Sequence, residues 1–288
     1  MTTQPIAQAS GTFTLGGDLT VHRLGFGTMR LTGKGIWGPP EDHDEAVRVL
    51  RRAVELGIDF FDTANSYGPY VAEELIREAL HPYRDGVVIA TKAGLLRTGE
   101  DQWTPLGFPA YLRQEVEMSL RRLGTDRIDL FQLHRIDPKF PAEDQIGELA
   151  ALQREGKIRH IGLSEISVEQ LTAAQKVTSI ASVQNRYNMA ERKAEPLLDA
   201  CQAQNIAFIP WAPLGSGPLV ADGGPLHRIA AEHHVKPSQL AVAWLLKRSP
   251  VMLPIPGTSR VAHLDENVSA AEVTLSDEEF DALRDADG

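Results

Sequence analysis

The chain has 288 residues, of which 42% are hydrophobic and 24% are charged, a composition typical of a globular protein with a substantial core. Its formal net charge of −10 disfavours binding to nucleic acid or to an anionic membrane, and no basic stripe compensates for that charge. No apolar run approaches the ~20 residues of a membrane span, and the N-terminus lacks the features of a secretory signal. We therefore expect a cytoplasmic protein that forms a single domain over residues 1–288.

The predicted elements begin with a β-hairpin at residues 11–24 ("GTFTLGGDLTVHRL"), in which "GGD" supplies the turn. Short apolar runs then alternate with segments of helical periodicity. Residues 42–57 and 109–124 are two such segments, and Gly57 and Gly124 are predicted to end them. The eight predicted strands lie at residues 24–28, 58–62, 86–92, 128–134, 158–164, 181–185, 206–211 and 251–257.

Apolar strands that alternate with amphipathic helices indicate a parallel sheet covered by helices. Eight repeats in a chain of this length favour an α/β fold of the closed (β/α)8 barrel type, the TIM barrel. An open doubly wound sheet is the alternative. Its dinucleotide fingerprint is poorly met, because "GFGTMR" has Gly25 and Gly27 but Arg30 where a third glycine belongs. A G-x-G at this place is more typical of close backbone packing.

Polar side chains occur where three consecutive strands end. Asp62 ends the second predicted strand, Lys92 the third and His134 the fourth, and Tyr67 follows Asp62 in the next loop. Neighbouring parallel strands lie ~4.8 Å apart, so the four side chains are expected to converge at the carboxyl end of the barrel, where barrel enzymes carry their chemistry. Each residue alone has a structural interpretation, such as a capped turn or a satisfied buried histidine, but core packing does not require the set.

The chemistry of these four residues fits around the phenol. A free tyrosine has a pKa near ~10, and an adjacent ammonium makes its proton easier to give. Lys92 is expected to supply that ammonium, Asp62 to hold it, and His134 to orient a substrate carbonyl. No serine or cysteine nucleophile is placed to attack the carbonyl carbon, so a hydride donor would complete the arrangement.

With these four residues, the chain resembles the aldo-keto reductases, NAD(P)H-dependent barrel oxidoreductases with an Asp, Tyr, Lys and His tetrad. The resemblance runs nearly end to end. It is carried, in the order of the family, by "GFGTMRL", "FFDTANSYG", "IATKAG", "LFQLHRID", "EGKIRHIGLSEIS", "VQNRYN", "PWAPLGSG" and "IPGTSRVAHLDENVSA". It implies that Tyr67 is the general acid, that Asp62 and Lys92 set its pKa, and that His134 orients the carbonyl.

The resemblance also implies where a nicotinamide coenzyme binds. Ser164 and Gln184 look like the partners of the carboxamide, with Glu165 beside them, and Trp211 looks like the ring that stacks on the nicotinamide. The backbone of a glycine-containing loop is suited to the pyrophosphate. The remaining residues implied as coenzyme contacts are Gly27, Thr28 and Met29 at the nicotinamide end, Leu214, Gly215 and Ser216 at the pyrophosphate, Gly257, Thr258, Ser259, Arg260, His263, Glu266 and Asn267 around the adenosine, and also Asp62 and Pro213.

Two departures from the family pattern bear on the coenzyme. Glu165 stands where many members have asparagine; it can accept from the carboxamide NH₂ but cannot donate. Arg260 is the main cation left for a 2'-phosphate, and arginine is suited to bidentate phosphate binding. The sequence thus favours NADPH over NADH.

The function that this sequence predicts is reversible, NADPH-dependent reduction of a small-molecule aldehyde or ketone, with no metal ion. A nicotinamide-nucleotide-sensing or regulatory barrel subunit with little turnover is one alternative, and a metal-dependent barrel hydrolase is another. Trp37, Trp103 and Arg135 are the candidate substrate contacts, together with Tyr67 and His134. The "GIWGPP" segment resembles bacterial members linked to pyridoxal reduction.

Overall fold

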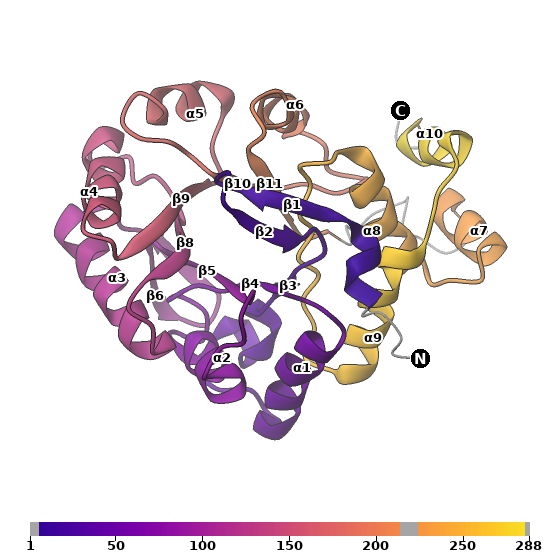
Figure 1. Cartoon of the computed structure of the whole chain (residues 1–288), viewed down its shortest axis with the longest axis horizontal. Coiled ribbons are helices and arrows are strands. Elements are labelled where there is room, and N and C mark those ends of the chain that lie inside the picture. Colours follow the sequence, from indigo (N-terminus) through magenta and orange to yellow (C-terminus); the bar gives the residue numbers. More distant parts are fainter. Residues whose placement is uncertain (1–5, 214–223, 286–288) are drawn as a thin grey trace.

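Parallel strands alternate with helices along most of the chain and curl into a barrel (Figure 1). The computed structural model describes residues 6–213 and 224–285. Seven strands form one parallel sheet in the order β11-β10-β9-β8-β5-β4-β3, so that neighbours in the sequence are neighbours in the sheet apart from an inserted hairpin after β5. These strands are β3 (Phe26–Gly27), β4 (Phe60–Asp62), β5 (Val88–Ala93), β8 (Ile128–Leu133), β9 (Ile158–Ser164), β10 (Ser182–Arg186) and β11 (Ala207–Trp211).

The eighth predicted strand closes the barrel although it forms only an isolated parallel bridge, between Phe208 and Met252. The amide of Leu253 donates to the carbonyl of Phe208 at 2.8 Å, and the amide of Gly25 donates to the carbonyl of Pro254 at 3.0 Å. This segment therefore joins β11 on one side to the residues before β3 on the other. Prolines interrupt the strand pattern because they lack an N–H for the ladder. The predicted (β/α)8 barrel is confirmed.

Helices cover the outside of the barrel, and their apolar faces pack on the strands (Figure 1). The first helix is capped by Asp42, whose side chain accepts from the amide of Glu45 at 2.8 Å. Gly57 and Gly124 follow helices with φ of 90° and 69°, as predicted for helix ends. The helices are α1 (His43–Glu55), α2 (Val71–Leu80), α3 (Pro109–Leu123), α4 (Ala142–Arg154), α5 (Val168–Ala174), α6 (Glu195–Ala203), α7 (Pro225–Glu232), α8 (Pro237–Arg248), α9 (Val261–Ser269) and α10 (Asp277–Asp285), with short 3-10 turns η1 (Ile6–Ser10), η2 (Met29–Leu31), η3 (Lys34–Ile36) and η5 (Ala270–Glu272).

The predicted N-terminal hairpin is present as β1 (Thr12–Leu15) and β2 (Leu19–His22), and it crosses the barrel in Figure 1. It lies at the amino ends of the strands. Asp18 in its turn pairs with Arg159 at 3.0 Å and with His160 at 2.6 Å, both near the start of β9. The backbone of His22 donates to Asp59 just before β4, at 2.9 Å.

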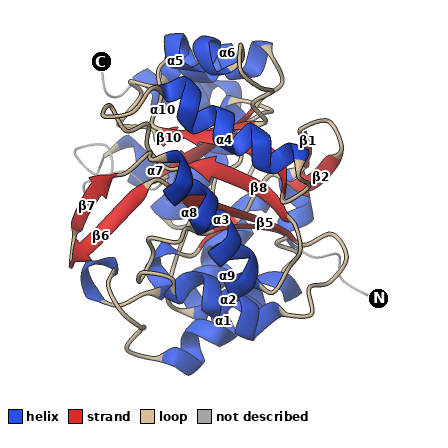
Figure 2. Cartoon of the chain, turned by 90° about the vertical axis from the view of Figure 1, so that its left-hand side faces the viewer, coloured by secondary structure: helices blue, strands red, loops and turns tan. Residues whose placement is uncertain are grey.

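Loops cover the opposite end of the barrel. A second hairpin, β6 (Leu95–Gly99) and β7 (Gln102–Pro105), follows β5 and projects from the barrel in Figure 2. It meets the loop that contains η3 after β3, because the amide of Asp101 donates to the carbonyl of Gly35 at 2.9 Å. The carboxyl ends of β3, β4 and β5 therefore lie beneath these two loops.

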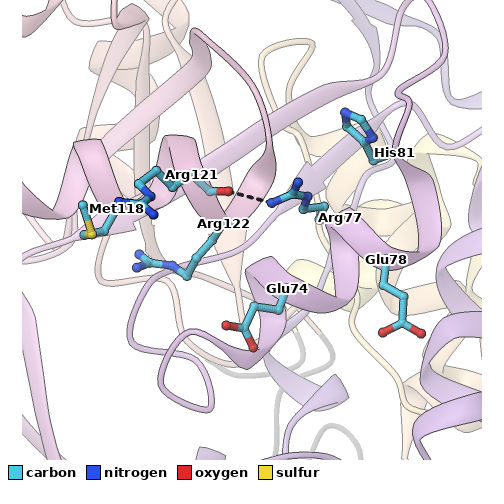
Figure 3. A pocket seen from close by; sticks show the side chains of 7 residues that line it. All are labelled: Glu74, Arg77, Glu78, His81, Met118, Arg121 and Arg122. Atoms are coloured by element: carbon cyan, nitrogen blue, oxygen red, sulfur yellow. Dashed lines mark hydrogen bonds between the residues drawn. The ribbon is translucent and has the colours of Figure 1, made fainter.

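A groove of ≈ 730 Å³ lies on the outer wall of the barrel, between α2 and α3 (Figure 3). Arg77 donates to the carbonyl of Arg121 across it at 2.9 Å. The helices of βα units run opposite to the strands, so the later turns of α2 and α3 lie toward the amino ends of the strands. The groove is thus remote from the strand ends that carry the candidate site; its lining residues are Glu74, Arg77, Glu78, His81, Met118, Arg121 and Arg122.

Candidate active site

Asp62, Lys92 and Tyr67 form a buried polar chain at the carboxyl ends of β4 and β5. The Lys92 ammonium lies 2.6 Å from Asp62 Oδ1 and 3.3 Å from the Tyr67 hydroxyl, and it also donates to the carbonyl of Thr63 at 2.8 Å. Asp62 is 1% exposed, Lys92 0% and Tyr67 6%. The structure brings together these three residues, which the sequence singled out, and fixes the lysine with three oxygen partners.

Two glutamine side chains complete the environment of Asp62. Its Oδ2 accepts from Gln132 Nε2 at 3.0 Å and from Gln184 Nε2 at 2.8 Å. The glutamines come from β8 and β10, so one carboxylate links four strands across the inside of the barrel. A buried charge pair is stable only when its remaining lone pairs are satisfied, and these amides satisfy them.

The pKa values of Lys92 and Tyr67 are both raised. Burial alone would lower the pKa of Lys92, but the charge of Asp62, followed by the interaction with Tyr67, outweighs burial, so the ammonium form persists. Burial raises the pKa of Tyr67, and the charge of Lys92 offsets part of this rise. The sequence led us to expect that the Lys92 ammonium would make the phenol proton easier to give. The lysine acts in the expected direction, but loss of solvent around the phenol is the larger effect.

His134 follows β8 and faces the phenol. Its ring lies edge-on to Tyr67, with centroids 5.9 Å apart, and its Nδ1 lies 3.3 Å from the hydroxyl oxygen of Ser66. Burial lowers its pKa well below the usual value of 6.5, and the charges of Lys92 and Arg135 lower it further. His134 is therefore a neutral imidazole at pH 7, which leaves one ring nitrogen able to donate a hydrogen bond.

The residues predicted to hold the nicotinamide lie on adjacent strands, but several have protein partners. Ser164 and Gln184 are paired in the β9–β10 register. Ser164 Oγ accepts from Arg135 at 3.1 Å, whereas Gln184 donates to Asp62. The Oε1 atom of Glu165 accepts from the indole N–H of Trp211 at 2.6 Å.

Glu165 also accepts from the backbone amide of Arg186 at 2.7 Å, and its own φ is 55°, in the left-handed region. Both hydrogen bonds use the same carboxylate oxygen, Oε1. The geometry thus makes Glu165 an anchor for the indole of Trp211, and the contact of Glu165 with the carboxamide, which the sequence left open, stays a prediction.

Gly27 ends β3, the first strand of the barrel, and Thr28 and Met29 follow it. Gly27 packs closely against the eighth strand segment: a Cβ at this position would lie 2.8 Å from the carbonyl of Ile255. The G-x-G thus marks close backbone packing, as predicted. The Thr28 hydroxyl donates to the carbonyl of Asp62 at 3.1 Å. Met29 lines a cleft of ≈ 530 Å³ together with Gly257, Thr258 and Ser259, so residues from the first and the eighth strand ends share one cavity.

The predicted adenosine contacts lie at the start of α9 and along it. Arg260 is exposed and immediately precedes the helix, and His263 is exposed on its first turn. Glu266 pairs with Lys236, which precedes α8. Asn267 is 6% exposed, Pro213 is buried at the end of the described segment after β11, and the predicted pyrophosphate residues Leu214, Gly215 and Ser216 lie outside the described residues.

The candidate substrate residues surround the phenol and the imidazole. The Trp103 ring lies edge-on to His134, with centroids 6.5 Å apart, and packs in a small apolar cluster with Tyr67. Trp37 is 38% exposed and forms a parallel bridge with Gly68. Arg135 donates to the carbonyl of His134 at 2.5 Å, which places its guanidinium between His134 and Ser164.

The sequence patterns did not lead us to two residues of this site, Gln132 and Arg97. Gln132 contacts Asp62, and the signal was available, since it is a polar residue in an apolar strand, two positions before His134 and hence on the same face. Arg97 donates to backbone carbonyls of several loops around Tyr67. No sequence pattern marks those carbonyls as its acceptors.

Comparison with known proteins gives a consistent result. A sequence model of the Aldo/keto reductase family matches residues 23–287. An uncharacterized oxidoreductase of Schizosaccharomyces pombe is 53% identical over 277 residues, covering 96% of this chain and 90% of the relative. Pyridoxine 4-dehydrogenase of Escherichia coli is 43% identical over 281 residues, covering 96% and 98%. A solved aldo-keto reductase from Klebsiella pneumoniae, in complex with NADPH, has a TM-score of 0.80 and 29% identity over 94% of this chain and 93% of that chain.

The chain belongs to the aldo/keto reductase family. This membership confirms the resemblance inferred from the motifs and the predicted enzyme class, an oxidoreductase that acts on carbonyl groups. Within residues 6–213 and 224–285, no helix is both long enough and apolar enough to cross a membrane.

Proposed function

We propose that this protein catalyses the NADPH-dependent, reversible reduction of aldehydes to alcohols, with Tyr67 as the general acid. The observation that carries this proposal is the buried chain from Asp62 through Lys92 to the Tyr67 hydroxyl, with distances of 2.6 and 3.3 Å. Burying a lysine beside a phenol costs folding free energy, and enzymes place such perturbed groups where they act on substrate.

NADPH is the coenzyme of this proposal, and when bound it supplies the hydride. The Klebsiella pneumoniae neighbour was solved in complex with NADPH. In this chain the donor set fits such a coenzyme: the exposed Arg260 offers a cation for a 2'-phosphate, and Trp211, held by Glu165, offers a flat ring. Ser164 remains able to donate its hydroxyl proton to the oxygen of a carboxamide, since its hydrogen bond with Arg135 uses the hydroxyl oxygen as acceptor.

The proton to the carbonyl oxygen comes from the Tyr67 hydroxyl. Loss of that proton leaves a phenolate next to the Lys92 ammonium, which stabilises the negative charge in a site that water does not reach. Asp62 keeps Lys92 charged, and Gln132 and Gln184 keep Asp62 ionised and fixed. Each member of the chain thus acts on the next, and only the phenol needs to contact the substrate.

His134 orients the carbonyl as a neutral donor. If the Ser66 hydroxyl donates to Nδ1, the proton of the ring is on Nε2 and is free for the substrate oxygen. The lowered pKa of His134 supports this assignment, because an imidazolium would compete with Tyr67 as the proton source.

For the substrate we propose an aromatic aldehyde such as pyridoxal. The relative from Escherichia coli is named a pyridoxine 4-dehydrogenase, and oxidation of pyridoxine at that position is the reverse of pyridoxal reduction. The His134 ring makes T-shaped contacts with Tyr67 and Trp103, and this set of aromatic rings suits a flat substrate.

The test is a comparison of the parent with Tyr67→Phe, using NADPH and 4-nitrobenzaldehyde or pyridoxal. We expect the variant to bind NADPH with unchanged affinity, measured by quenching of tryptophan fluorescence, while kcat falls by at least ~10²-fold because the general acid is lost. A variant that reduced either aldehyde at the parental rate would refute the role of Tyr67. A parent that bound NADPH but reduced no aldehyde in a panel would favour a nucleotide-sensing role instead.

A further inference from the structure

We propose that Arg97 is a positioning residue that fixes the substrate side of the active site. It would do so by joining three separate loops into one wall next to Tyr67 and His134. We call the residues Ile36, Trp37 and Trp103 the substrate wall. This inference rests on the function proposed above, since it concerns the shape of the same site.

The guanidinium of Arg97 uses all five of its N–H donors on backbone carbonyls. Its Nε donates to Gln102 at 2.9 Å, and one terminal nitrogen donates to Ile36 at 2.6 Å and to Ser66 at 2.9 Å. The other terminal nitrogen donates to Gly35 at 2.7 Å and to Gly99 at 3.2 Å. One side chain thereby connects the loop after β3, the loop after β4 and the β6–β7 hairpin.

Ser66 is the point at which Arg97 is joined to the residues of the proposed reaction. Ser66 immediately precedes Tyr67, and its hydroxyl contacts His134. The carbonyl held by Arg97 is thus covalently next to the proposed proton donor, so Arg97 sets the substrate wall beside the phenol, whose hydroxyl is itself held by Lys92. Arg97 itself touches neither the phenol hydroxyl nor the imidazole in any hydrogen bond that the structure shows.

Within the substrate wall, the backbone of Ile36 depends most on its hydrogen-bond partners. Its φ is 54°, in the left-handed region that β-branched residues rarely adopt. Strained residues persist where surrounding contacts hold them, and here the Ile36 carbonyl accepts from Arg97 and from the amide of Gly68 at 3.3 Å. Without Arg97, one of these two bonds is lost and the loop is free to relax.

Arg97 also stacks on the rings of the wall. Its guanidinium carbon lies 3.6 Å from the centroid of Trp103 and 5.7 Å from that of Trp37. Trp103 in turn lies against His134. Among the described residues, no carboxylate forms an ion pair with Arg97. Its guanidinium contacts the two indoles and the five carbonyls, and Asp101 acts on it only through the longer-range attraction of its charge. Arginine is suited to this combination, because its planar group stacks and donates at once, whereas lysine has three donors and no plane.

The proposal is tested with Arg97→Met and Arg97→Lys on a large and a small aldehyde, 4-nitrobenzaldehyde and propanal. We expect KM for 4-nitrobenzaldehyde to rise on the order of tenfold in both variants, while kcat changes by less than roughly twofold. KM for propanal, which is too short to reach the rings, is expected to stay within roughly twofold of the parent value. The Kd for NADPH should not change. Arg228→Met, which removes an exposed arginine on α7 that pairs with Glu232, is the matched control.

A Trp103→Ala background shows whether Arg97 acts through the wall. If it does, Arg97→Met should raise KM for 4-nitrobenzaldehyde by less than roughly twofold once Trp103 is absent, because coupled residues are not additive. Near-UV circular dichroism of the tryptophans gives a readout independent of turnover, and Arg97→Met is expected to weaken it.

Several results would overturn the proposal. A Lys variant with the parental KM would show that charge alone is needed. An equal loss of kcat on both aldehydes, or a weaker Kd for NADPH, would place Arg97 in a different role. An unchanged tryptophan spectrum in Arg97→Met would overturn it even if the parent reduced no aldehyde. Failure of the proposed function is recognised separately, by a parent that lacks turnover while its spectrum still depends on Arg97.

Discussion

The two ends of the barrel treat charge in opposite ways. At the amino end, Asp18 in a hairpin turn pairs with Arg159 and His160, and the Asp18 side chain is 57% exposed. At the carboxyl end, Asp62 and Lys92 pair in full burial. Solvent-exposed pairs contribute little to stability and tolerate loss of a partner, whereas a buried pair depends on both members. The pairs at the amino end hold the hairpin against the barrel, whereas the pair at the carboxyl end keeps two charges in a site from which water is excluded.

Among the substitutions that test this difference between the two ends, Lys92→Met is expected to have the largest effect. Removing the ammonium leaves the Asp62 carboxylate buried without its cation, so we expect the free energy of unfolding to fall by ~3–5 kcal/mol. Reduction of aldehydes should fall by at least ~10²-fold as well. Urea unfolding and NADPH oxidation at saturating aldehyde measure the two effects.

Lys157→Met is the matched control for that substitution, because Lys157 pairs with Glu117 at the amino end of the barrel, before β9. It should leave both readouts close to the parent values. A double variant, Lys92→Met with Asp62→Asn, should recover part of the stability without recovering activity. Equal losses of stability in Lys92→Met and Lys157→Met would contradict the contrast between the two ends.

A second prediction concerns pH. The pKa of His134 is lowered in the folded protein relative to ~6.5 in the unfolded chain, so the unfolded chain binds more protons below that pH. Stability that is fully present above pH ~6.5 is therefore lost as pH falls toward the folded pKa, by on the order of 1 kcal/mol at pH 5.5. We expect His134→Asn to show a shallower decline of the free energy of unfolding between pH 7 and 5.5. An unaltered slope would show that His134 is not held neutral.

The smallest expected effect is that of Glu165→Gln. The amide keeps the size of the side chain but offers a weaker acceptor to the indole N–H of Trp211. We expect the Kd for NADPH to rise a few-fold, corresponding to ~1 kcal/mol, with little change in thermal stability. Asp18→Asn, at the other end of the barrel, weakens a carboxylate acceptor without affecting NADPH. Equal NADPH affinity in the Glu165→Gln variant and the parent would show that Glu165 does not position the ring.

Much of this architecture could be predicted because it depends on local patterns. Alternating apolar runs and helical periodicity indicated the barrel, and polar residues at the ends of successive strands indicated Asp62, Lys92 and His134. Parallel strands place their ends together, so sequence order was enough to infer convergence.

The rest depends on contacts that a pattern of side chains does not encode. The acceptors of Arg97 are main-chain carbonyls in three loops, and the partner of Glu165 is an indole two strands away. The effect of Lys92 on the pKa of Tyr67 has the predicted direction, but the larger, opposite effect of burial depends on how deeply the phenol lies in the fold. That the whole chain forms one domain stays a prediction, as do the roles of the individual site residues.

The seam where the barrel closes determines when, during synthesis, the cleft beside it can form. Gly27 and Gly257 meet so closely there that a Cβ on Gly257 would lie 2.4 Å from the Gly27 carbonyl. The cleft is lined by residues that follow both the first and the last strand of the barrel, so a nascent chain cannot form it until residues 251–259 have left the ribosome. A coenzyme that binds there, as the sequence predicts, would stabilise only chains synthesised past that point, and a truncated product that lacks the last strand would gain no protection from NADPH against proteolysis.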